Sequence, residues 1–359
     1  MSVYLHGLST ALPPHCLAQS EVRKRAEIIF GETYPQFERL SKTFDTAGID
    51  RRYSVVPIDW FSEEHGWADR NAAFMEGAKA LFIDAAQAAL DTAGWQGSEV
   101  DCVVTVCSTG LATPSLEAQV LGEMGFRDDI MRVPIFGLGC AGGVSGLSTA
   151  QSIAAGRPGA KVLLVVVETC SLSFRADRMQ KADIVAAVLF ADGAAAACIS
   201  TEAPGAGQVI SLGQGHQKTW PNTLDVMGWD VDEIGFGVIF DRSIPGFVTA
   251  EFAAAAEGAL KAANLNHDEI DRYVCHPGGA KVVEAIEGAL HLEQGVLDAE
   301  RAVLREAGNM SAPTMLFVMR AVLDSGKTGQ MMGCALGPGF TASFLPFHVG
   351  PAQSEREAA

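Results

Sequence analysis

Three side chains in this sequence, Cys140, His276 and Asn309, have the residue types that covalent acyl transfer requires. Cys140 lies in "GLGCAGGVSG", after an apolar strand-like stretch and before a run of small residues typical of a closely packed helix. A thiol at a helix N-terminus experiences the positive end of the helix dipole, which favours the thiolate. The surrounding glycines allow backbone and substrate to approach it. Taken alone, a cysteine in this setting is more often a small buried core residue.

His276 and Asn309 lie far downstream of Cys140. His276 ends a short apolar stretch in "CHPGGA", and Asn309 precedes an expected helix that Ser311 and Pro313 help to start. Taken singly, the histidine is more often structural and the asparagine more often an N-cap. Together with Cys140 they supply a nucleophile, its proton partner and an amide donor for a developing oxyanion.

An internal duplication indicates how these residues meet. The helix-like "AAQAALDTAGWQGSEV" leads into the strand-like "DCVVTVCSTG", and "AAEGALKAANLNHDEI" leads into "DRYVCHPGG" in the same register. A second match joins "FADGAAAACI" with "LGPGFTASFL". Two matches in the same order predict two similar α/β halves, residues 1–205 and 206–359, with the active site where strand ends of both halves meet.

Composition limits the classes of partner. The formal net charge of −17 argues against nucleic acid and anionic membrane surfaces, which bind clustered Lys and Arg. No apolar run approaches the ~20 residues that span a bilayer, so we expect no membrane insertion. Eight cysteines without CxxC pairs or metal-ligand spacing predict reduced thiols, no metal site and a cytoplasmic location.

Four motifs in this order resemble the Cys-His-Asn signatures of type III polyketide synthases, the chalcone synthase-like branch of the thiolase superfamily. They are "GCAGG", "HPGG", "GNMSAPT" and "ALGPGF", and the resemblance covers nearly the whole chain, including "FDTAGIDRRY" and "LFADGAAAACI". It implies a thiolase-like five-layered αβαβα fold and a homodimer. It also implies decarboxylative condensation of malonyl-CoA onto an acyl-CoA starter, without a cofactor, since the CoA thioesters are substrates.

The resemblance gives each of the three residues a role. Cys140 holds the starter acyl group as a thioester, and His276 is the ion-pair partner of its thiolate. His276 and Asn309 donate hydrogen bonds to the thioester oxygen of malonyl-CoA and stabilise the enolate that forms as carbon dioxide leaves.

Three further positions concern the shape of the substrate cavity. Phe190 matches a phenylalanine that gates the passage between the CoA tunnel and the cavity, with a core aromatic as the alternative. Val238 stands where plant members carry a second gate phenylalanine; it suits a bulky or long aliphatic starter unless Phe236 or Phe240 refills the space. Trp229 replaces a glycine of the plant cyclisation pocket and favours lactone over aromatic-ring closure. Val238 and Trp229 can equally be ordinary residues of a strand and its preceding turn.

Glu168, in "VVVETCSLSF", matches an acidic position near the pocket. It is expected to support a water relay in cyclisation or to make a buried structural hydrogen bond. Cys170 and Ser173 are placed on the cavity wall. Thr113 stands where plant enzymes present a methionine across the dimer interface.

The resemblance also assigns residues to coenzyme A and to the backbone around Cys140. Arg51 and Arg52 are among these positions, and for them surface charges or ion pairs are the alternative. The positions are Gly278, Gly279 and Ala280 for the pantetheine arm, Gly337, Pro338 and Gly339 for the oxyanion scaffold, and Lys42, Arg51 and Arg52 for the CoA phosphates.

Two other functions compete with this interpretation. Ketoacyl synthase III-like enzymes also use Cys, His and Asn for a single condensation, but they typically show His-Gln-Ala-Asn where this chain has "HPGG". A catalytically silent thiolase-fold subunit would lack a nucleophile, whereas this chain supplies one. The sequence therefore predicts an iterative polyketide synthase that makes an alkylpyrone or alkylresorcinol from a medium- or long-chain starter.

Overall fold

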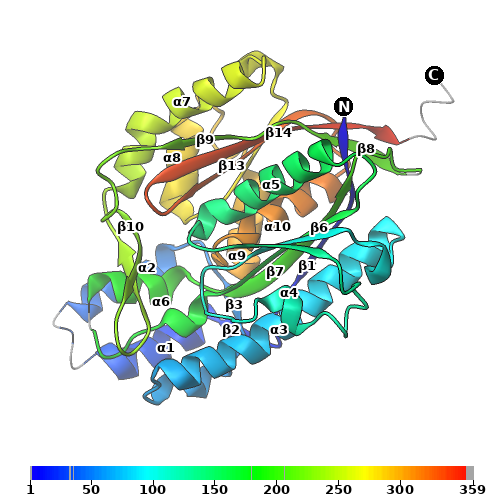
Figure 1. The fold of residues 1–359 in the computed structure, drawn as a ribbon. Helices are drawn as coiled ribbons and strands as arrows, with labels where there is room; N and C mark the ends of the chain where they lie inside the picture. Colours follow the sequence, from blue (N-terminus) through cyan, green and yellow to red (C-terminus); the bar gives the residue numbers. More distant parts are fainter. Residues whose placement is uncertain (1, 32–33, 35, 179, 206, 353–359) are drawn as a thin grey trace.

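The computed structural model describes residues 2–31, 34, 36–178, 180–205 and 207–352 and has a mixed α/β architecture (Figure 1). Ten strands form a hydrogen-bonded sheet in the order β12-β13-β14-β8-β1-β7-β6-β4-β5, with β9 paired to β14. The strands of this sheet are β1 (Val3–Ala11), β4 (Cys102–Val106), β5 (Met131–Ile135), β6 (Val162–Thr169), β7 (Asp192–Ser200), β8 (Gln208–Leu212), β9 (His216–Thr219), β12 (Arg272–Cys275), β13 (Gly329–Gly337) and β14 (Thr341–Ala352).

Two short hairpins lie outside this sheet, and helices connect and cover the strands. The hairpins are β2 (His15–Ala18) with β3 (Arg51–Ser54) and β10 (Met227–Val231) with β11 (Phe236–Phe240). The α-helices are α1 (Gln19–Phe30), α2 (Phe37–Thr46), α3 (Trp67–Ala93), α4 (Leu116–Gln119), α5 (Gly142–Gly156), α6 (Lys181–Leu189), α7 (Ile244–Ala262), α8 (Ala280–Ala289), α9 (Asp298–Ala307) and α10 (Pro313–Asp324). The 3₁₀ turns are η1 (Ile58–Ser62), η2 (Gly97–Glu99), η3 (Gly139–Ala141), η4 (Cys170–Ser173) and η5 (His267–Glu269).

The layers follow from three hydrophobic clusters. Apolar side chains of α5 and α10 pack between the strands of the two halves. Helix α3 covers the other face of the N-terminal strands, and α7 and α8 cover the other face of the C-terminal strands. In Figure 1, α3 and the α7–α8 pair accordingly lie on opposite sides of α5 and α10. This arrangement is the predicted αβαβα order of layers.

Strand β6 shows why the centre of the sheet reads as a continuous apolar run. All eight residues of "VLLVVVET" are buried, because helices cover both faces of the strand. Its neighbours β4 and β7 are buried at every position as well. This doubly covered strand ends at Glu168 and Thr169, so a carboxylate is carried into the buried interior.

The duplicated segments adopt the same order of elements. Helix α3 leads through η2 into β4, and α7 leads through η5 into β12. Each 3₁₀ turn carries a capping box, Gln96 with Glu99 in the first half and Asn266 with Glu269 in the second. The boundary between residues 205 and 206 stays a prediction, and residue 206 lies outside the described residues.

Two findings concern the environment of the chain. Among the described residues, no helix combines the length and the hydropathy that crossing a bilayer demands. All eight cysteines lie within the described residues and are free thiols; Cys16 is exposed and the other seven are buried.

Candidate active site

Cys140 lies in η3, between the end of β5 and the start of α5. Gly137 and Gly139 adopt positive φ values of 88° and 46°, so the turn before the thiol needs residues without a side chain. A Cβ on Gly143 would lie 2.3 Å from the carbonyl oxygen of Ala312, just before α10. The glycines around Cys140 therefore serve both a tight turn and close packing of the segment before α10.

His276 follows β12, which runs parallel to β13. The backbone N–H of His276 donates to the carbonyl of Cys334 in β13 at 2.8 Å. At the end of the same strand, a Cβ on Gly337 would lie 2.5 Å from the carbonyl oxygen of Leu138 and 2.7 Å from Cβ of Ala141. Strand β13 thus joins the histidine of one half to the cysteine turn of the other.

The residues after Gly337 complete the support of this turn. A Cβ on Gly139 would lie 2.6 Å from the ring of Pro338, so the two residues are in close contact. Gly339 adopts a positive φ of 67°. The structure therefore places Gly337, Pro338 and Gly339 at the Cys140 turn, in the region where the resemblance puts the oxyanion scaffold.

Asn309 links the two sides of the site through its amide group. Its Nδ2 donates to the carbonyl of Gly278 at 3.1 Å, two residues beyond His276. Its Oδ1 accepts a hydrogen bond of 2.8 Å from the backbone N–H of Ser311, whose hydroxyl forms a hydrogen bond with the Cys140 thiol. The contacts run from Cys140 through Ser311 and Asn309 to the His276 loop, so the three predicted catalytic residues converge.

Two details of this chain of contacts differ from what the sequence predicts. The N-cap of α10 is Ala312, so Asn309 does not cap that helix. Ser311, expected only to help start the helix, adopts a left-handed φ of 61° and borders the thiol. A hydroxyl two residues after Asn309 in "GNMSAPT" was the signal that could have identified it.

Burial dominates the electrostatics of Cys140 and His276. Desolvation raises the pKa of the Cys140 thiol to about 11, with the Ser311 hydrogen bond offsetting part of the increase. Desolvation lowers the pKa of His276 to about 3, and neither ring nitrogen has a hydrogen-bond partner among the described residues. Burial thus opposes the stabilisation of the thiolate that a helix N-terminus is expected to provide.

The pKa shifts of Cys140 and His276 leave one route of low free energy to a reactive thiolate. Each charged form is disfavoured by itself, whereas proton transfer from Cys140 to His276 creates opposite charges whose attraction is strong in a buried site. The unpartnered ring nitrogens of His276 remain free for the thiol proton and for a substrate oxygen. The role of His276 as the ion-pair partner of the Cys140 thiolate stays a prediction, and the two pKa shifts are compatible with it.

Glu168 is fully buried at the end of β6, and burial raises its pKa to about 8. Its carboxyl oxygens accept hydrogen bonds from the backbone N–H of Ser108 at 3.0 and 3.1 Å and from the hydroxyl of Thr109 at 2.7 Å. The Ser108 hydroxyl in turn accepts from the backbone N–H of Gly137 at 3.1 Å. Glu168 therefore makes the structural hydrogen bonds that were the alternative to a relay, and they support the cysteine turn.

Trp229 and Val238 face each other across the β10–β11 hairpin as paired residues. The indole N–H of Trp229 donates to the carbonyl of Ser108 at 2.8 Å. This bond attaches the hairpin to the loop after β4, whose Ser108 N–H also binds Glu168. At the end of β11, the ring of Phe240 meets Phe190 edge-on with centroids 6.5 Å apart. Phe240 thus lies beside the predicted gate, while Phe236 packs against Trp229. Which of the two refills the space at Val238 stays a prediction.

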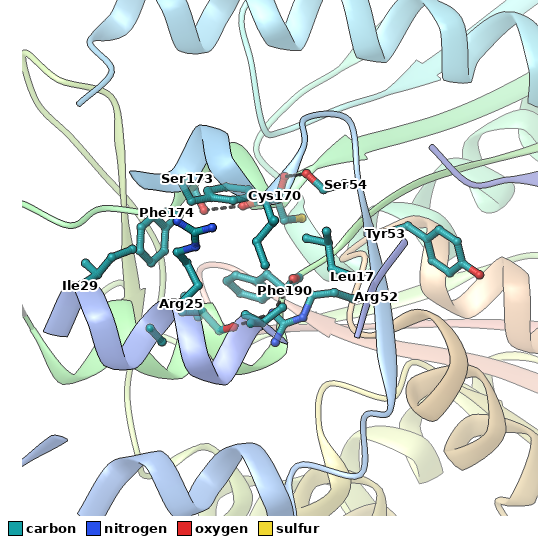
Figure 2. Close-up of a pocket in the computed structure, with 17 residues that line it drawn as sticks. Leu17, Arg25, Ile29, Arg52, Tyr53, Ser54, Cys170, Ser173, Phe174 and Phe190 are labelled. Atoms are coloured by element: carbon teal, nitrogen blue, oxygen red, sulfur yellow. Dashed lines mark hydrogen bonds between the residues drawn. The ribbon is translucent and has the colours of Figure 1, made fainter. Parts of the chain in front are cut away.

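Phe190, Cys170 and Ser173 line one cavity, as expected for residues of a cavity wall (Figure 2). This α1–α6 pocket encloses about 590 Å³ between protein atoms, including solvent at its mouth, and its wall is mostly apolar. Cys170 also lies close enough to interact electrostatically with the Cys140 thiol. The remaining lining residues are Leu17, Val22, Arg25, Ala26, Ile29, Arg52, Tyr53, Ser54, Ile58, Phe61, Ser171, Phe174, Ala186 and Ala187.

A second cavity, here termed the outer groove, lies on the other side of the Phe190–Phe240 pair. It encloses about 1330 Å³, including open solvent, and Phe240 and Leu189 belong to its wall. Gly278, Gly279 and Ala280 line it, where the resemblance places the pantetheine arm. Three cations that sequence reasoning did not single out also line it, namely Lys181, Arg242 and Lys281.

The structure separates the three cations assigned to the CoA phosphates. Lys42 is exposed on α2. It does not line the outer groove itself, but Leu40 and Thr43 of the same helix do. Arg51 is half-exposed and forms an ion pair of 3.2 Å with Glu306, which is the surface alternative. Thr113 is exposed in the loop after β4 and lines neither cavity.

The assignment of Arg52 to a CoA phosphate is wrong. Its side chain is 4% exposed and donates to Gln19 Oε1 and to the carbonyls of Ala187, Val188 and Phe190. These carbonyls belong to the last turn of α6, where intrahelical donors run out. Arg52 therefore caps α6 and fixes the backbone of Phe190, with its pKa lowered by burial to about 9.

Comparison with known proteins identifies the family of the chain. Residues 2–203 match the family model described as chalcone and stilbene synthases, N-terminal domain, and residues 211–348 match the corresponding C-terminal domain. The chain belongs to the chalcone and stilbene synthase family. Membership in this family of type III polyketide synthases decides against the ketoacyl synthase III-like alternative.

Bacterial members of the family are similar to this type III polyketide synthase over its whole length. It is 35% identical to a 1,3,6,8-tetrahydroxynaphthalene synthase of Streptomyces peucetius subsp. caesius, covering 94% of this chain and 91% of the relative. It is 32% identical to a putative chalcone synthase of Bacillus subtilis, covering 96% and 98%. The crystal structure of 1,3,6,8-tetrahydroxynaphthalene synthase from Streptomyces coelicolor A3(2) superposes with a TM-score of 0.91 at 27% identity, covering 97% and 99%.

Proposed function

We propose that this type III polyketide synthase extends a medium- or long-chain fatty acyl-CoA with malonyl-CoA and closes the product to an alkylpyrone or alkylresorcinol. The α1–α6 pocket carries the proposal. Its wall includes Cys170, which interacts electrostatically with the Cys140 thiol, and Phe190, whose backbone forms a bridge with Asn309. Elsewhere the wall is built from apolar side chains of α1 and η1 and from Phe174. A mostly apolar pocket with Cys170 in its wall suits an alkyl chain, because each methylene buried there contributes about 0.8 kcal/mol.

The proposed reaction follows from the contacts of the three catalytic residues. The thiolate of Cys140, formed by proton transfer to His276, attacks the starter thioester, and CoA leaves as the Sγ–carbonyl bond forms. The carboxylate of malonyl-CoA then leaves as carbon dioxide, and the thioester oxygen of the enolate accepts hydrogen bonds from His276 and Asn309. The enolate carbon attacks the acyl carbonyl, and Cys140 departs as the new carbon–carbon bond forms.

We propose that the outer groove is the entrance for coenzyme A. Lys181, Arg242 and Lys281 line it and present ammonium and guanidinium groups that suit phosphates. Gly278 and Gly279 line the same groove and lie between His276 and Lys281 along the chain, which leaves room for an extended arm. The Phe190–Phe240 pair then stands between the groove and the α1–α6 pocket.

The experiment that tests the starter class blocks the α1–α6 pocket. Ala187→Phe places a large ring into the pocket, whereas Ala187→Ser keeps nearly the same volume and serves as the control. With labelled malonyl-CoA and acyl-CoA starters from C6 to C18, we expect Ala187→Phe to lose long-chain products and to retain decarboxylation of malonyl-CoA. Equal long-chain yields from Ala187→Phe and Ala187→Ser would rule out this pocket as the acyl site.

The similarity to tetrahydroxynaphthalene synthases supports a second candidate, the formation of a hydroxylated naphthalene without an alkyl chain. The same incubation distinguishes the two. A product made from malonyl-CoA alone, undiminished by Ala187→Phe, would favour the naphthalene. Products that carry the added acyl chain favour the alkylpyrone or alkylresorcinol.

We further propose a homodimer in the cytoplasm. Strand β5 ends the sheet, and the large apolar side chains of Met131, Phe136 and Leu111 are exposed at and beside it. Exposed apolar groups next to an unpaired strand edge are typical of a subunit interface. The free thiols suit a reducing compartment. Light scattering of the wild type and of Phe136→Lys tests the dimer, since a monomeric wild type would contradict it.

A further inference from the structure

Arg25 has an unusual place among the residues of the α1–α6 pocket. Within its lining, Arg25 and Arg52 are the two charged side chains. Arg52 is committed to Gln19 and to the end of α6. Arg25 instead rises from α1 on the side of the pocket formed by Ile29 and Phe174, with Phe190 between it and Leu17 (Figure 2).

The guanidinium group of Arg25 connects two elements at the surface. It donates to Asp59 Oδ1 at 2.5 Å and to the hydroxyl of Ser62, both in η1. The Asp59 side chain is 84% exposed, so this contact lies at the solvent end of the pocket, whereas Cys170 lies at its buried end. The Arg25 side chain therefore spans the gap between α1 and η1 where the apolar pocket meets water.

One apolar side chain is exposed on the surface outside this contact. Ile28 lies one turn beyond Arg25 on α1 and is 75% exposed. An alkyl chain that passed between α1 and η1 would meet this isoleucine instead of a purely polar surface. An arginine stem along an apolar wall with its head in water is a common arrangement, and the head can move at little cost.

We propose that Arg25, held by Asp59 and Ser62, closes the outer end of the α1–α6 pocket and determines the longest starter chain that the enzyme accepts. The inference rests on the proposed long-chain starter. Starter chains too short to reach Arg25 bind without disturbing its contacts with Asp59 and Ser62, here termed the Arg25 latch. Longer chains displace its guanidinium group from η1 and emerge over Ile28.

The size of the effect follows from the exposure of the ion pair. Exposed pairs of this kind favour the closed form by up to about fivefold. Each methylene that stays buried strengthens binding by about fourfold, so the gain from added carbons ends once the chain meets Arg25. We therefore expect Arg25→Ala to raise kcat/KM for C16 and C18 starters by about threefold to fivefold relative to C8.

The test compares Arg25→Ala with Arg23→Ala across a series of acyl-CoA starters. Arg23 lies on α1 like Arg25, pairs with Asp45 of α2 and does not line the pocket, so its substitution is a matched control. We expect the wild type and Arg23→Ala to share one chain-length profile and Arg25→Ala to shift toward longer chains. In Arg25→Ala the KM should fall for the long starters, while the KM values and the malonyl-CoA decarboxylation of Arg23→Ala should match the wild type.

Asp59→Ala keeps the test decisive if Arg25→Ala folds poorly, because this exposed carboxylate can be removed without opening the core. A shift toward longer chains in Asp59→Ala supports the latch. An unchanged profile in Arg25→Ala or Asp59→Ala, in enzyme that still uses long starters, overturns the latch and leaves the proposed function intact. A wild type that uses only malonyl-CoA overturns the proposed function itself.

Discussion

Replacing Arg52 with alanine should destabilise the protein strongly and leave coenzyme A binding unchanged. Among the described residues, Arg52 donates five hydrogen bonds, at 3.2 and 2.5 Å to Gln19 Oε1 and at 2.5, 2.8 and 3.0 Å to the carbonyls of Ala187, Val188 and Phe190. The alanine variant leaves these acceptors in a buried region without donors. The end of α6 and the backbone of Phe190 lose their main attachment to β3.

The expected loss in the free energy of unfolding is about 3 to 5 kcal/mol. Hydrogen bonds to a charged donor contribute about 1.5 to 3 kcal/mol each, and water that enters the vacated space restores part of that total. A loss of this size is a large fraction of the roughly 5 to 15 kcal/mol that stabilises a typical protein. Arg52→Lys should recover little, because one ammonium group cannot reach acceptors spread over the last turn of α6.

Urea denaturation followed by tryptophan fluorescence measures the change, with Arg51→Ala as the matched control. Arg51 is half-exposed and paired with Glu306, so its removal should cost less than about 1 kcal/mol. Below the unfolding transition, the KM for malonyl-CoA should match the wild type in both variants. An Arg52→Ala protein with wild-type stability and a raised KM would refute the capping role and restore the phosphate assignment.

Two further predictions concern reactivity and product shape. In a Cys16→Ser background, His276→Gln should leave the Cys140 thiol with a pKa near its buried value of about 11. Alkylation of that thiol should then rise about tenfold per pH unit from pH 8 to 10, whereas the wild type should level off earlier; superimposable profiles would show that His276 does not take the thiol proton. Trp229→Gly should shift products from pyrone toward ring-closed resorcinol, and Trp229→Phe, which loses only the hydrogen bond to Ser108, should shift them less. A constant product ratio in both variants, measured by mass spectrometry, would contradict a steric role for Trp229.

The layered fold and the convergence of the catalytic residues were predictable because their signals are local or repeated. The duplicated helix-to-strand segments and the apolar run of β6 define strands and their order without knowledge of distant contacts. Cys140, His276 and Asn309 each follow an element whose end is visible in the sequence. The αβαβα arrangement then brings the ends of elements from both halves together.

The side chains that surround the nucleophile were less predictable. Ser311 reads as a helix-start residue, and its contact with Cys140 depends on a left-handed backbone conformation that the motif alone does not reveal. Phe240 was one of two possible replacements for a missing gate, and its ring position against Phe190 depends on how the β10–β11 hairpin packs on α6. Such contacts join residues 50 or more positions apart.

The sequence by itself predicted the acyl-transfer chemistry of this protein, because a thiol, an imidazole and an amide occur in ordered glycine-rich motifs that resemble the signatures of one family. The tertiary structure decided the electrostatics and the division of labour among the cations. Burial, a property of the packed chain, raises the pKa of the Cys140 thiol and lowers the pKa of His276. Burial also separates the neighbours Arg51 and Arg52, since alternate residues of a strand point to opposite faces and only one of the two meets the end of α6.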